Sequence, residues 1–261
     1  MPEIITAPII RSMRTKGEKV VCITAYDAVF GELADAAGAD IVLVGDSVGN
    51  TVLGYSSTIP VNLEDMVHHT RAVRRGVKRA LLIADLPFGS YQSSTEQAVQ
   101  AAVALVKAGA QAVKLEGSYT QAIAEIIRAG IPVMGHVGMT PQSINLYGGF
   151  RVQGKGDHAQ GVLNAAKQVQ NAGAFAIVLE LIPAALSAQI TDLLHIPTIG
   201  IGAGVNCSGQ VQVIYDVLGL SQTPLKHAKS YVAGRESLVS AIKQYTSDVR
   251  EGVFPGDENS F

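Results

Sequence analysis

Acidic side chains follow several of the apolar runs in this sequence, each at the point where the run ends. Asp46 comes after "IVLVG", Asp85 after "LLIA", and Glu116 two residues after Lys114 in "AVKLEG". Carboxylates that converge in a buried site repel one another unless a cation or a shared proton compensates for their charge. Oxygen ligands favour a hard ion such as Mg2+, and no Cys/His spacing here indicates zinc. These residues therefore predict a site for a divalent cation.

Simple structural roles are the alternative for each polar residue taken singly. An acid after a strand can cap the next helix or pair with a nearby Arg. Lys114 can form a salt bridge with Glu116 or Asp85, and His136 in "GHVGMTPQS" can donate to a backbone carbonyl. The pair His68-His69 lies in a predicted helix, where solvated or packed histidines are the ordinary case. The acidic set as a whole is harder to explain in this way.

Glu180 stands apart from the other acids because it lies between "FAIVL" and "LIP". Little that is near it in sequence stabilises a negative charge. Burial disfavours the charged form of a carboxyl group, which suits a general base. The alternative is a protonated or ion-paired structural Glu.

The elements that must position these residues are short apolar runs that alternate with Ala-rich helical stretches. Gly38, Gly109, Gly130 and Gly173 each close a helical stretch just before a new run, as a left-handed helix cap does. Eight buried strands covered by helices favour a closed parallel barrel, the (β/α)8 or TIM barrel, over an open sheet. The eight runs occupy residues 19–26, 40–47, 79–87, 111–118, 131–138, 175–183, 196–204 and 211–219.

Strand alternation predicts which side chains share a face of the sheet. Lys114 and Glu116 project to the same side, which in a barrel can be the lumen. By the same count Leu81, Ile83 and Asp85 share one face, and Val42, Val44 and Asp46 share another. Two carboxylates would then lie at the ends of two adjacent strands.

Length and composition indicate one globular domain over residues 1–261. Of the 261 residues 48 % are hydrophobic and 16 % charged, and no linker divides the chain. A helix is expected from about Glu236 to Arg250, followed by a polar tail. The net charge of −2 gives no basic field for nucleic acid or membrane, so small molecules are the expected ligands.

The N-terminal sequence lacks the patterns of a secretion signal or a transit peptide. No apolar run reaches the roughly 18 to 20 residues of a membrane span. We therefore expect a cytoplasmic protein that does not bind membranes. Its two cysteines, Cys22 and Cys207, are expected to be unpaired, as suits a reducing compartment.

A series of longer strings runs through nearly the whole chain: "TAYDA", "VGDSVGNTVLGYSST", "HHTRAVRRG", "ADLPFGSY", "AVKLEG", "GHVGMTPQS", "GGFRVQGKG", "IGIGAG" and "GVFPGDENSF". In content and order they resemble the ketopantoate hydroxymethyltransferase family. The resemblance implies a Mg2+-dependent (β/α)8 barrel that transfers a one-carbon unit from 5,10-methylenetetrahydrofolate to 3-methyl-2-oxobutanoate. The products are 2-dehydropantoate (ketopantoate) and tetrahydrofolate, in pantothenate biosynthesis. The resemblance also implies a homo-oligomer, typically a homodecamer of two pentameric rings.

The same resemblance implies roles for particular residues. The metal ligands would be Asp46, Asp85 and Glu116. Asp46 and Asp85 would also contact the keto acid, together with Ser47 and Lys114. Glu180 would be the proton acceptor. Ser208, where an Asp is common, and His68, where an aromatic residue is frequent, are departures that do not touch these positions.

Two other functions compete with this one. A C–C lyase or phosphonomutase related to isocitrate lyase would also use a barrel, Mg2+ and an α-keto acid, but those families carry a "KKCGH"-like lid that the sequence lacks. A non-catalytic metabolite-binding barrel would be expected to lack a metal or base residue. The residues that bind the folate are not predicted, although the loops 54–61 and 135–156 are long and polar enough to contribute.

Overall fold

A computed structural model describes residues 3–221 and 225–260 of the chain. The contacts divide the chain into two compact units, Met1–Val213 and Ile214–Phe261. The single domain over residues 1–261 stays a prediction. Within the described residues, no helix is both long enough and apolar enough to cross a membrane.

The first unit is a closed barrel of eight parallel strands in sequence order, with β8 paired to β1. The predicted (β/α)8 architecture is therefore confirmed. Every strand but the last coincides with part of a predicted apolar run. The strands are β1 Val20–Thr24, β2 Ile41–Val44, β3 Leu81–Asp85, β4 Ala112–Lys114, β5 Val133–Gly138, β6 Ala176–Glu180, β7 Thr198–Ile201 and β8 Gly209–Gln212.

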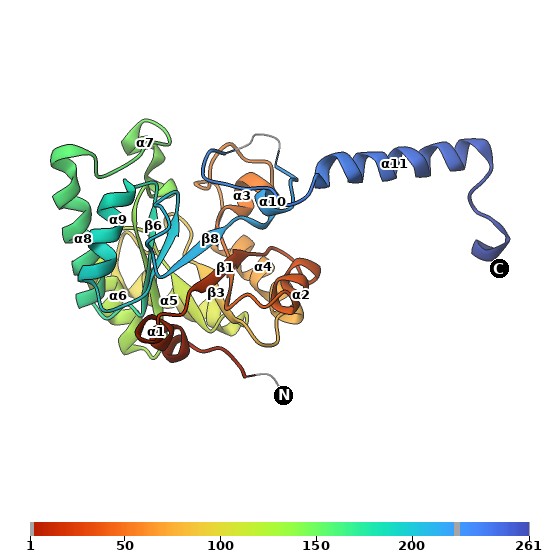
Figure 1. The fold of residues 1–261 in the computed structure, drawn as a ribbon. Coiled ribbons are helices and arrows are strands. Elements are labelled where there is room, and N and C mark those ends of the chain that lie inside the picture. Colours follow the sequence, from red (N-terminus) through yellow and green to blue (C-terminus); the bar gives the residue numbers. More distant parts are fainter. Residues whose placement is uncertain (1–2, 222–224, 261) are drawn as a thin grey trace. The chain divides into compact units, whose positions relative to one another are not determined.

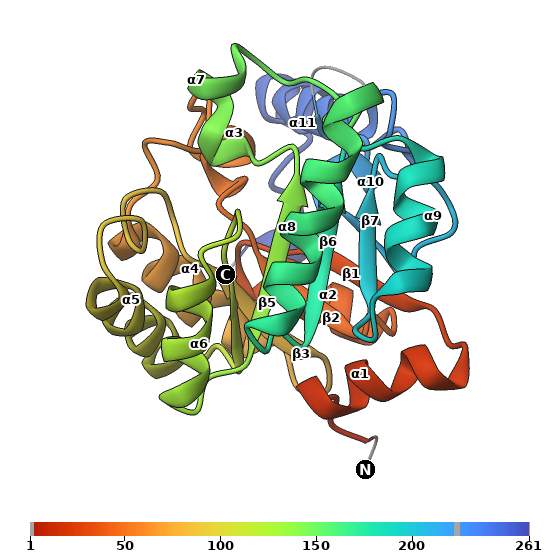
Figure 2. The same ribbon diagram turned by 90° about the vertical axis from the view of Figure 1, so that its left-hand side faces the viewer.

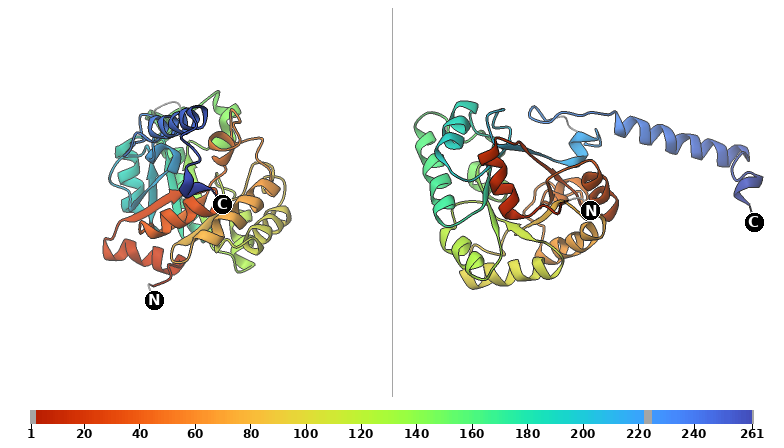
Figure 3. Two further views of the ribbon diagram at one scale, coloured as in Figure 1. Left: turned by 90° about the vertical axis from the view of Figure 1, so that its right-hand side faces the viewer. Right: turned by 60° about the horizontal axis from the view of Figure 1, so that its bottom comes forward.

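Helices follow most of the strands and lie outside the ring, as Figure 2 shows for α5, α6 and α8. The right-hand view of Figure 3 shows them around the strands. The four glycines predicted to cap helices all have positive φ, between 89° and 116°, so this prediction is confirmed. The helices of this unit are α1 Ala7–Lys16, α2 Ala28–Ala36, α3 Val48–Thr51, α4 Leu63–Gly76, α5 Thr95–Lys107, α6 Thr120–Arg128, α7 Ile144–Tyr147, α8 Ala159–Asn171 and α9 Ala184–Leu193, with short 3-10 turns η1 Pro141–Ser143 and η2 Gly156–His158.

Several helices begin where a polar side chain caps the first turn. Asp27 accepts a hydrogen bond from the backbone of Phe30 at the start of α2, and Ser94 accepts one from Gln97 at the start of α5. Asn62 forms a reciprocal capping box at the start of α4. Such caps satisfy N–H groups that have no partner within the helix. They fix where the segments after β1, β2 and β3 turn into helices.

The helix α1 was not predicted, and it closes the end of the barrel opposite the site. Its residues Ile10 and Met13 belong to one buried apolar cluster with side chains from the strands. Pro8 at the start and Gly17 in a left-handed cap at the end delimit the helix. Both are ordinary helix boundary signals.

The predicted face alternation is confirmed for Leu81 and Ile83 of β3, and in β2 it holds for Val42 and Val44 but does not extend to Asp46. Leu81 and Ile83 belong to the interior cluster, and Asp85 ends the same face of β3. In β2 the interior residues are Ile41 and Leu43, not Val42 and Val44. The strand ends at Val44, so alternation does not govern Asp46, which lies in the turn before α3.

The eighth predicted strand is displaced toward the N-terminus. β8 begins at Gly209, paired with Val20 of β1 and Ile199 of β7, and it ends at Gln212. The remaining apolar residues "IYDV" form α10, Ile214–Val217. A short apolar run does not distinguish a strand from a buried helical segment.

The second unit (Figure 1) also contains α11, Gly234–Glu251, and the 3-10 turn η3, Asp257–Asn259.

The packing of α8 on β5 requires a residue without a side chain at Gly135. A Cβ atom there would lie 2.2 Å from Cγ1 of the fully buried Val169 on α8. Gly135→Ala is therefore expected to lower the free energy of unfolding by about 1–3 kcal/mol through overpacking, measured by urea denaturation. Gly161→Ala is the matched control, because nothing lies within 4 Å of a Cβ on this exposed position of α8. It should raise stability by about 0.5–1 kcal/mol, and a loss at both positions would contradict the packing argument.

Candidate active site

The polar residues predicted for the site gather at the carboxyl ends of five neighbouring strands, β2 to β6. Asp85 and Glu180 are the last residues of β3 and β6, Lys114 is the last of β4, and His136 lies within β5. Asp46, Asp85, Lys114, Glu116 and His136 are all at most 4 % exposed. The structure thus brings the predicted residues together at the end of a (β/α)8 barrel where active sites occur.

Asp85 and Lys114 form a buried ion pair between adjacent strands. Lys114 Nζ lies 2.8 Å from Asp85 Oδ1, and their side chains are 6 % and 3 % exposed. The other oxygen of Asp85 accepts a hydrogen bond of 3.0 Å from the backbone N–H of Asp46. Of the two partners left open for Lys114, the structure selects Asp85. The ion pair ties the end of β3 to the end of β4, and the hydrogen bond from Asp46 ties the end of β2 to the end of β3.

His136 lies between two of the acids. Its Nε2 is 3.3 Å from Oε2 of Glu180, and its Nδ1 is 3.7 Å from Oε1 of Glu116. Neither nitrogen makes a hydrogen bond of good geometry to any described residue, so the predicted alternative of a bond to a backbone carbonyl is wrong. Burial lowers the pKa of His136, which favours the neutral ring.

The backbone around Glu180 is fixed by bonds on both sides. Glu180 O accepts from Met139 N at 2.8 Å, and Leu181 N donates to Ile201 O at 2.9 Å. Leu181 has φ 44°, the one left-handed residue other than glycine among the described positions. Such a conformation costs energy in a Leu and persists where surrounding bonds impose it. The Glu180 carboxyl group, 14 % exposed, is therefore carried on a rigid strand end.

Ser47 follows Asp46 and is held from a different strand. Its hydroxyl lies 2.8 Å from the hydroxyl of Tyr26, which is 1 % exposed and follows β1. The backbone carbonyl oxygen of Tyr26 lies 2.7 Å from Nδ1 of His69 on α4. The string "TAYDA" held this partner of Ser47, but a Tyr after an apolar run carries no signal of its role.

Gln142 was also missed, although it connects two of the predicted acids. Its backbone N–H donates to Oε2 of Glu116 at 2.9 Å, and its Nε2 donates to Oδ2 of Asp46 at 2.8 Å. The residue lies in η1, in the loop after β5, and is 4 % exposed. It lies six residues beyond His136 and outside any apolar run, so the pattern of strand ends does not predict a role for it.

The electrostatics show an excess of buried negative charge. Burial, and then the charge of Asp85, raises the pKa of Asp46 to about 7. Burial and the charge of Asp46 raise the pKa of Glu116 well above its ordinary value. Burial opposes the charge of Lys114, but the surrounding carboxylates outweigh it and raise its pKa. The single positive charge of Lys114 does not neutralise Asp46, Asp85 and Glu116. Such an excess of buried charge is typical of functional sites.

The donor set fits a hard divalent cation by its chemistry. Oδ1 of Asp46 and Oε1 of Glu116 accept no hydrogen bond from any described residue, and both groups lack a compensating positive charge of their own. Within residues 3–221 and 225–260, no group of three His, Cys, Asp or Glu side chains is arranged so that it could hold a metal ion. The assignment of Asp46, Asp85 and Glu116 as ligands therefore stays a prediction.

Metal-free protein is expected to show the titration of Asp46 in its stability. Between the ordinary Asp pKa of 3.8 and about 7, the folded state holds a proton that the unfolded state has released, so stability falls as pH rises. The measured quantity is the difference in free energy of unfolding between wild type and Asp46→Asn. As pH rises through this window, the wild type should lose at most about 1.4 kcal/mol per pH unit relative to the variant. Urea denaturation in EDTA measures it. Taking the difference cancels His136, whose lowered pKa acts with the opposite sign, and a flat difference would contradict a raised pKa.

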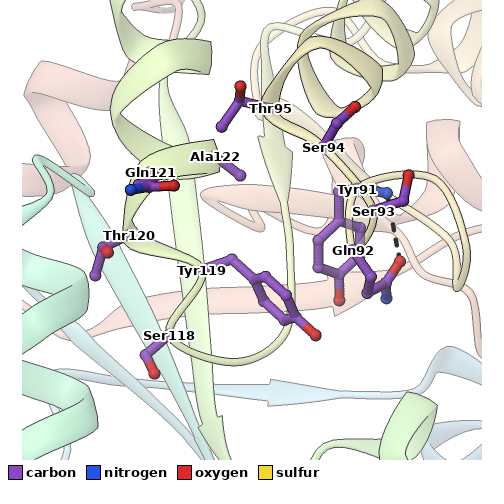
Figure 4. Close-up of a pocket in the computed structure, with 10 residues that line it drawn as sticks. All are labelled: Tyr91, Gln92, Ser93, Ser94, Thr95, Ser118, Tyr119, Thr120, Gln121 and Ala122. Atoms are coloured by element: carbon purple, nitrogen blue, oxygen red, sulfur yellow. Dashed lines mark hydrogen bonds between the residues drawn. The ribbon is translucent and has the colours of Figure 1, made fainter.

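A cavity of about 290 Å³ lies between the segments that follow β3 and β4, and its lining does not include the acids, Lys114 or His136. Figure 4 shows its lining, which comes from the segments leading into α5 and α6 and carries mainly hydroxyl and amide groups. The rings of Tyr91 and Tyr119 meet edge to face with centroids 5.2 Å apart. Tyr91 connects the cavity to the acids, because its hydroxyl lies 3.2 Å from the backbone N–H of Glu116 and accepts its hydrogen bond.

Known proteins resemble the chain in sequence over almost its full length. Residues 4–257 match the family model described as ketopantoate hydroxymethyltransferase. The 3-methyl-2-oxobutanoate hydroxymethyltransferase of Chloroflexus aurantiacus is 56 % identical, covering 98 % of this chain and 92 % of its own. The enzyme of the same name from Syntrophus aciditrophicus is 52 % identical, covering 98 % and 96 %.

Solved structures of low sequence identity share the fold. A phosphonopyruvate hydrolase in complex with oxalate and Mg++ superposes with a TM-score of 0.65 at 12 % identity, covering 98 % of this chain and 93 % of that one. A 2,3-dimethylmalate lyase of the PEP mutase/isocitrate lyase superfamily gives 0.63 at 14 % identity, covering 99 % and 92 %. At such identities the likeness extends to the fold alone.

Proposed function

Because the chain belongs to the ketopantoate hydroxymethyltransferase family, we propose that it transfers a hydroxymethyl group to 3-methyl-2-oxobutanoate in pantothenate biosynthesis. The donor in this proposal is 5,10-methylenetetrahydrofolate, and the products are 2-dehydropantoate and tetrahydrofolate. The observation that supports it most directly is the convergence of the family-matched residues at one end of the barrel. The reaction needs a base for a C–H bond and positive charge for an α-keto acid, and the cluster contains groups suited to both.

Binding of the keto acid is assigned to Lys114 and Ser47, together with Asp46 and Asp85. Lys114 supplies the positive charge for the carboxylate of the substrate, and its ion pair with Asp85 holds the ammonium group in place. The Ser47 hydroxyl, held by Tyr26, is a hydrogen-bond donor for the same anionic end. Asp46, Asp85 and Glu116 would hold Mg2+, which when bound supplies positive charge to the keto oxygen.

Glu180 is assigned as the general base. It takes the proton from C3 of the keto acid, and the electron pair left on C3 forms the bond to the methylene carbon of the folate. The methylene carbon is bonded to two folate nitrogens, and both C–N bonds break, one as C3 bonds to this carbon and one as the oxygen of a water does. Each nitrogen keeps the electron pair of its bond and gains a proton, one from Glu180 and one from the water, whose O–H remains as the hydroxyl group of the product. The rigid backbone at Glu180 and Leu181 supports this role, because proton transfer requires the base at a fixed position.

Assembly into a homo-oligomer is part of the proposal. The second unit supports it, because apolar side chains recur along one side of α11 and stay exposed within that unit: Leu238 54 %, Ile242 64 % and Tyr245 57 %. Exposed apolar patches of this kind mark interaction surfaces. A decamer, as in the family, is the expected species in sedimentation velocity.

A proton NMR time course in D2O tests the reaction. The enzyme is incubated with 3-methyl-2-oxobutanoate and Mg2+, with and without methylenetetrahydrofolate. The expected result is enzyme-dependent loss of the C3 proton signal in both samples and a new hydroxymethyl signal only with folate. Exchange without that product would indicate an enolising enzyme with another electrophile. Absence of exchange in both samples would favour the metabolite-binding barrel.

A further inference from the structure

The loop after β5 places one residue between two carboxylates that come from different strands. Gln142 donates its backbone N–H to Oε2 of Glu116, after β4, at 2.9 Å, and donates Nε2 to Oδ2 of Asp46, after β2, at 2.8 Å. No other described residue bonds to the side chains of both acids. Two carboxylates that repel one another thus share one neutral donor residue.

The amide of Gln142 has a partner at each of its hydrogen-bonding positions. Nε2 also donates to Leu86 O at 3.0 Å, and Oε1 accepts from Tyr91 Oη at 2.7 Å and from Gln92 Nε2 at 3.1 Å. The Leu86 carbonyl and an ionised Asp46 can only accept, so the NH2 end of the amide must face them. A flipped amide would set oxygen against oxygen. The orientation is therefore determined by the neighbours.

These bonds leave one oxygen free on each acid. Oδ1 of Asp46 and Oε1 of Glu116 receive no hydrogen bond from the part of the chain that the structure describes. Outer hydrogen bonds that fix a ligating carboxylate are a recurrent requirement of metal sites. We propose that Gln142 is a positioning residue that engages one oxygen of Asp46 and one of Glu116 and presents the other oxygen of each to a divalent cation. This inference rests on the proposed function.

Direct contact with the folate is a weaker role for this residue, although its loop is one of the two considered for that contact. Gln142 is 4 % exposed and its amide has no hydrogen-bonding position left. A ligand could bind the amide only by displacing Asp46, Leu86, Tyr91 or Gln92. The positioning role requires no such displacement.

The test uses the full chain and Mn2+ as the probe. Gln142→Met keeps the length of the side chain and the backbone N–H but removes the amide. Gln142→Asn keeps an amide that is one methylene shorter and serves if the Met variant does not fold. Gln160→Met is the matched control, because Gln160 is exposed on α8 and bonds only to Asn164 among the described residues.

Mn2+ binding is titrated by electron paramagnetic resonance at a temperature where circular dichroism shows each variant folded. The Met variant is expected to bind Mn2+ about 10- to 100-fold more weakly, and Gln160→Met as tightly as wild type. A purely structural role would lower the thermal midpoint without changing Mn2+ affinity in the folded protein. Wild-type affinity in a folded Met or Asn variant would overturn the inference.

The same samples separate this inference from the proposed function. If wild-type protein binds Mn2+ and exchanges the C3 proton while Gln142→Met retains wild-type Mn2+ affinity, only the role of Gln142 fails. If wild type itself neither binds Mn2+ nor exchanges the proton, both the proposed function and the inference that rests on it are wrong. Weakened Mn2+ binding together with exchange restored at high Mn2+ concentration would support both.

Discussion

Glu180→Gln is expected to lower the rate of C3 deuterium exchange by about 10²- to 10⁴-fold, the range that a positioned general base contributes. Gln has nearly the shape of Glu but cannot take a proton, so the change removes the chemistry and leaves the packing. Exchange is followed by proton NMR in D2O with saturating 3-methyl-2-oxobutanoate. Because Glu180 is not among the assigned metal ligands, Mn2+ affinity and keto-acid binding should stay near wild type.

Glu125→Gln is the control for this substitution. Glu125 lies on α6 with its side chain 37 % exposed and paired to Arg128, outside the site, so its loss should not change the exchange rate. Retained exchange in Glu180→Gln would assign the base to another residue. Lost exchange accompanied by lost Mn2+ binding would indicate a disturbed site rather than a missing base.

Asp85→Ala is expected to lower the free energy of unfolding by about 3–5 kcal/mol, because it leaves Lys114 buried without its partner. It also removes the acceptor for the backbone N–H of Asp46. Since Asp85 is assigned both as metal ligand and as substrate contact, Mn2+ and keto-acid binding should weaken together. Urea denaturation in EDTA measures the stability, and calorimetric titration of the folded protein measures the two affinities.

An exposed ion pair of the same kind calibrates this effect. Glu125→Ala removes the partner of Arg128 on the surface of α6, where solvent screens the charges and the loss of stability should be far smaller. The double variant Asp85→Ala/Lys114→Met replaces the buried pair by apolar groups and should regain part of the stability, without metal binding. A loss in Asp85→Ala as small as that in Glu125→Ala, with unchanged Mn2+ affinity, would contradict both roles of Asp85.

The barrel was predictable because its signals are local and repeated. Each apolar run is short, most are followed by a helical stretch, and four of those stretches end at a glycine that adopts the left-handed conformation. The eighth strand was misplaced because it starts at Gly209 through pairing with Val20, which lies 189 positions away in the chain. No residue near Gly209 in the sequence indicates that the strand pairs with Val20.

The site was predictable where a residue ends a regular strand. Asp85 continues the interior face of Leu81 and Ile83, so alternation suffices to place it. Asp46 lies beyond the end of β2, and its placement depends on a turn and on the bond to Asp85. The role of Gln142 arises from contacts with residues 26 and 96 positions away, which a single sequence does not display.

The glycines that end α2, α5, α6 and α8 have a consequence for how far this chain can be altered in length. They lie in the loops that lead into β2, β4, β5 and β6, whereas Asp46, Glu116, His136 and Glu180 lie toward the other ends of those strands. Two or three residues inserted after Gly38 or Gly173 would lengthen a loop remote from the acids without shifting any strand register. The same insertion after Gly138 would shift Gln142 away from Glu116 and Asp46. Tolerance to insertion should therefore differ sharply between the two ends of one barrel.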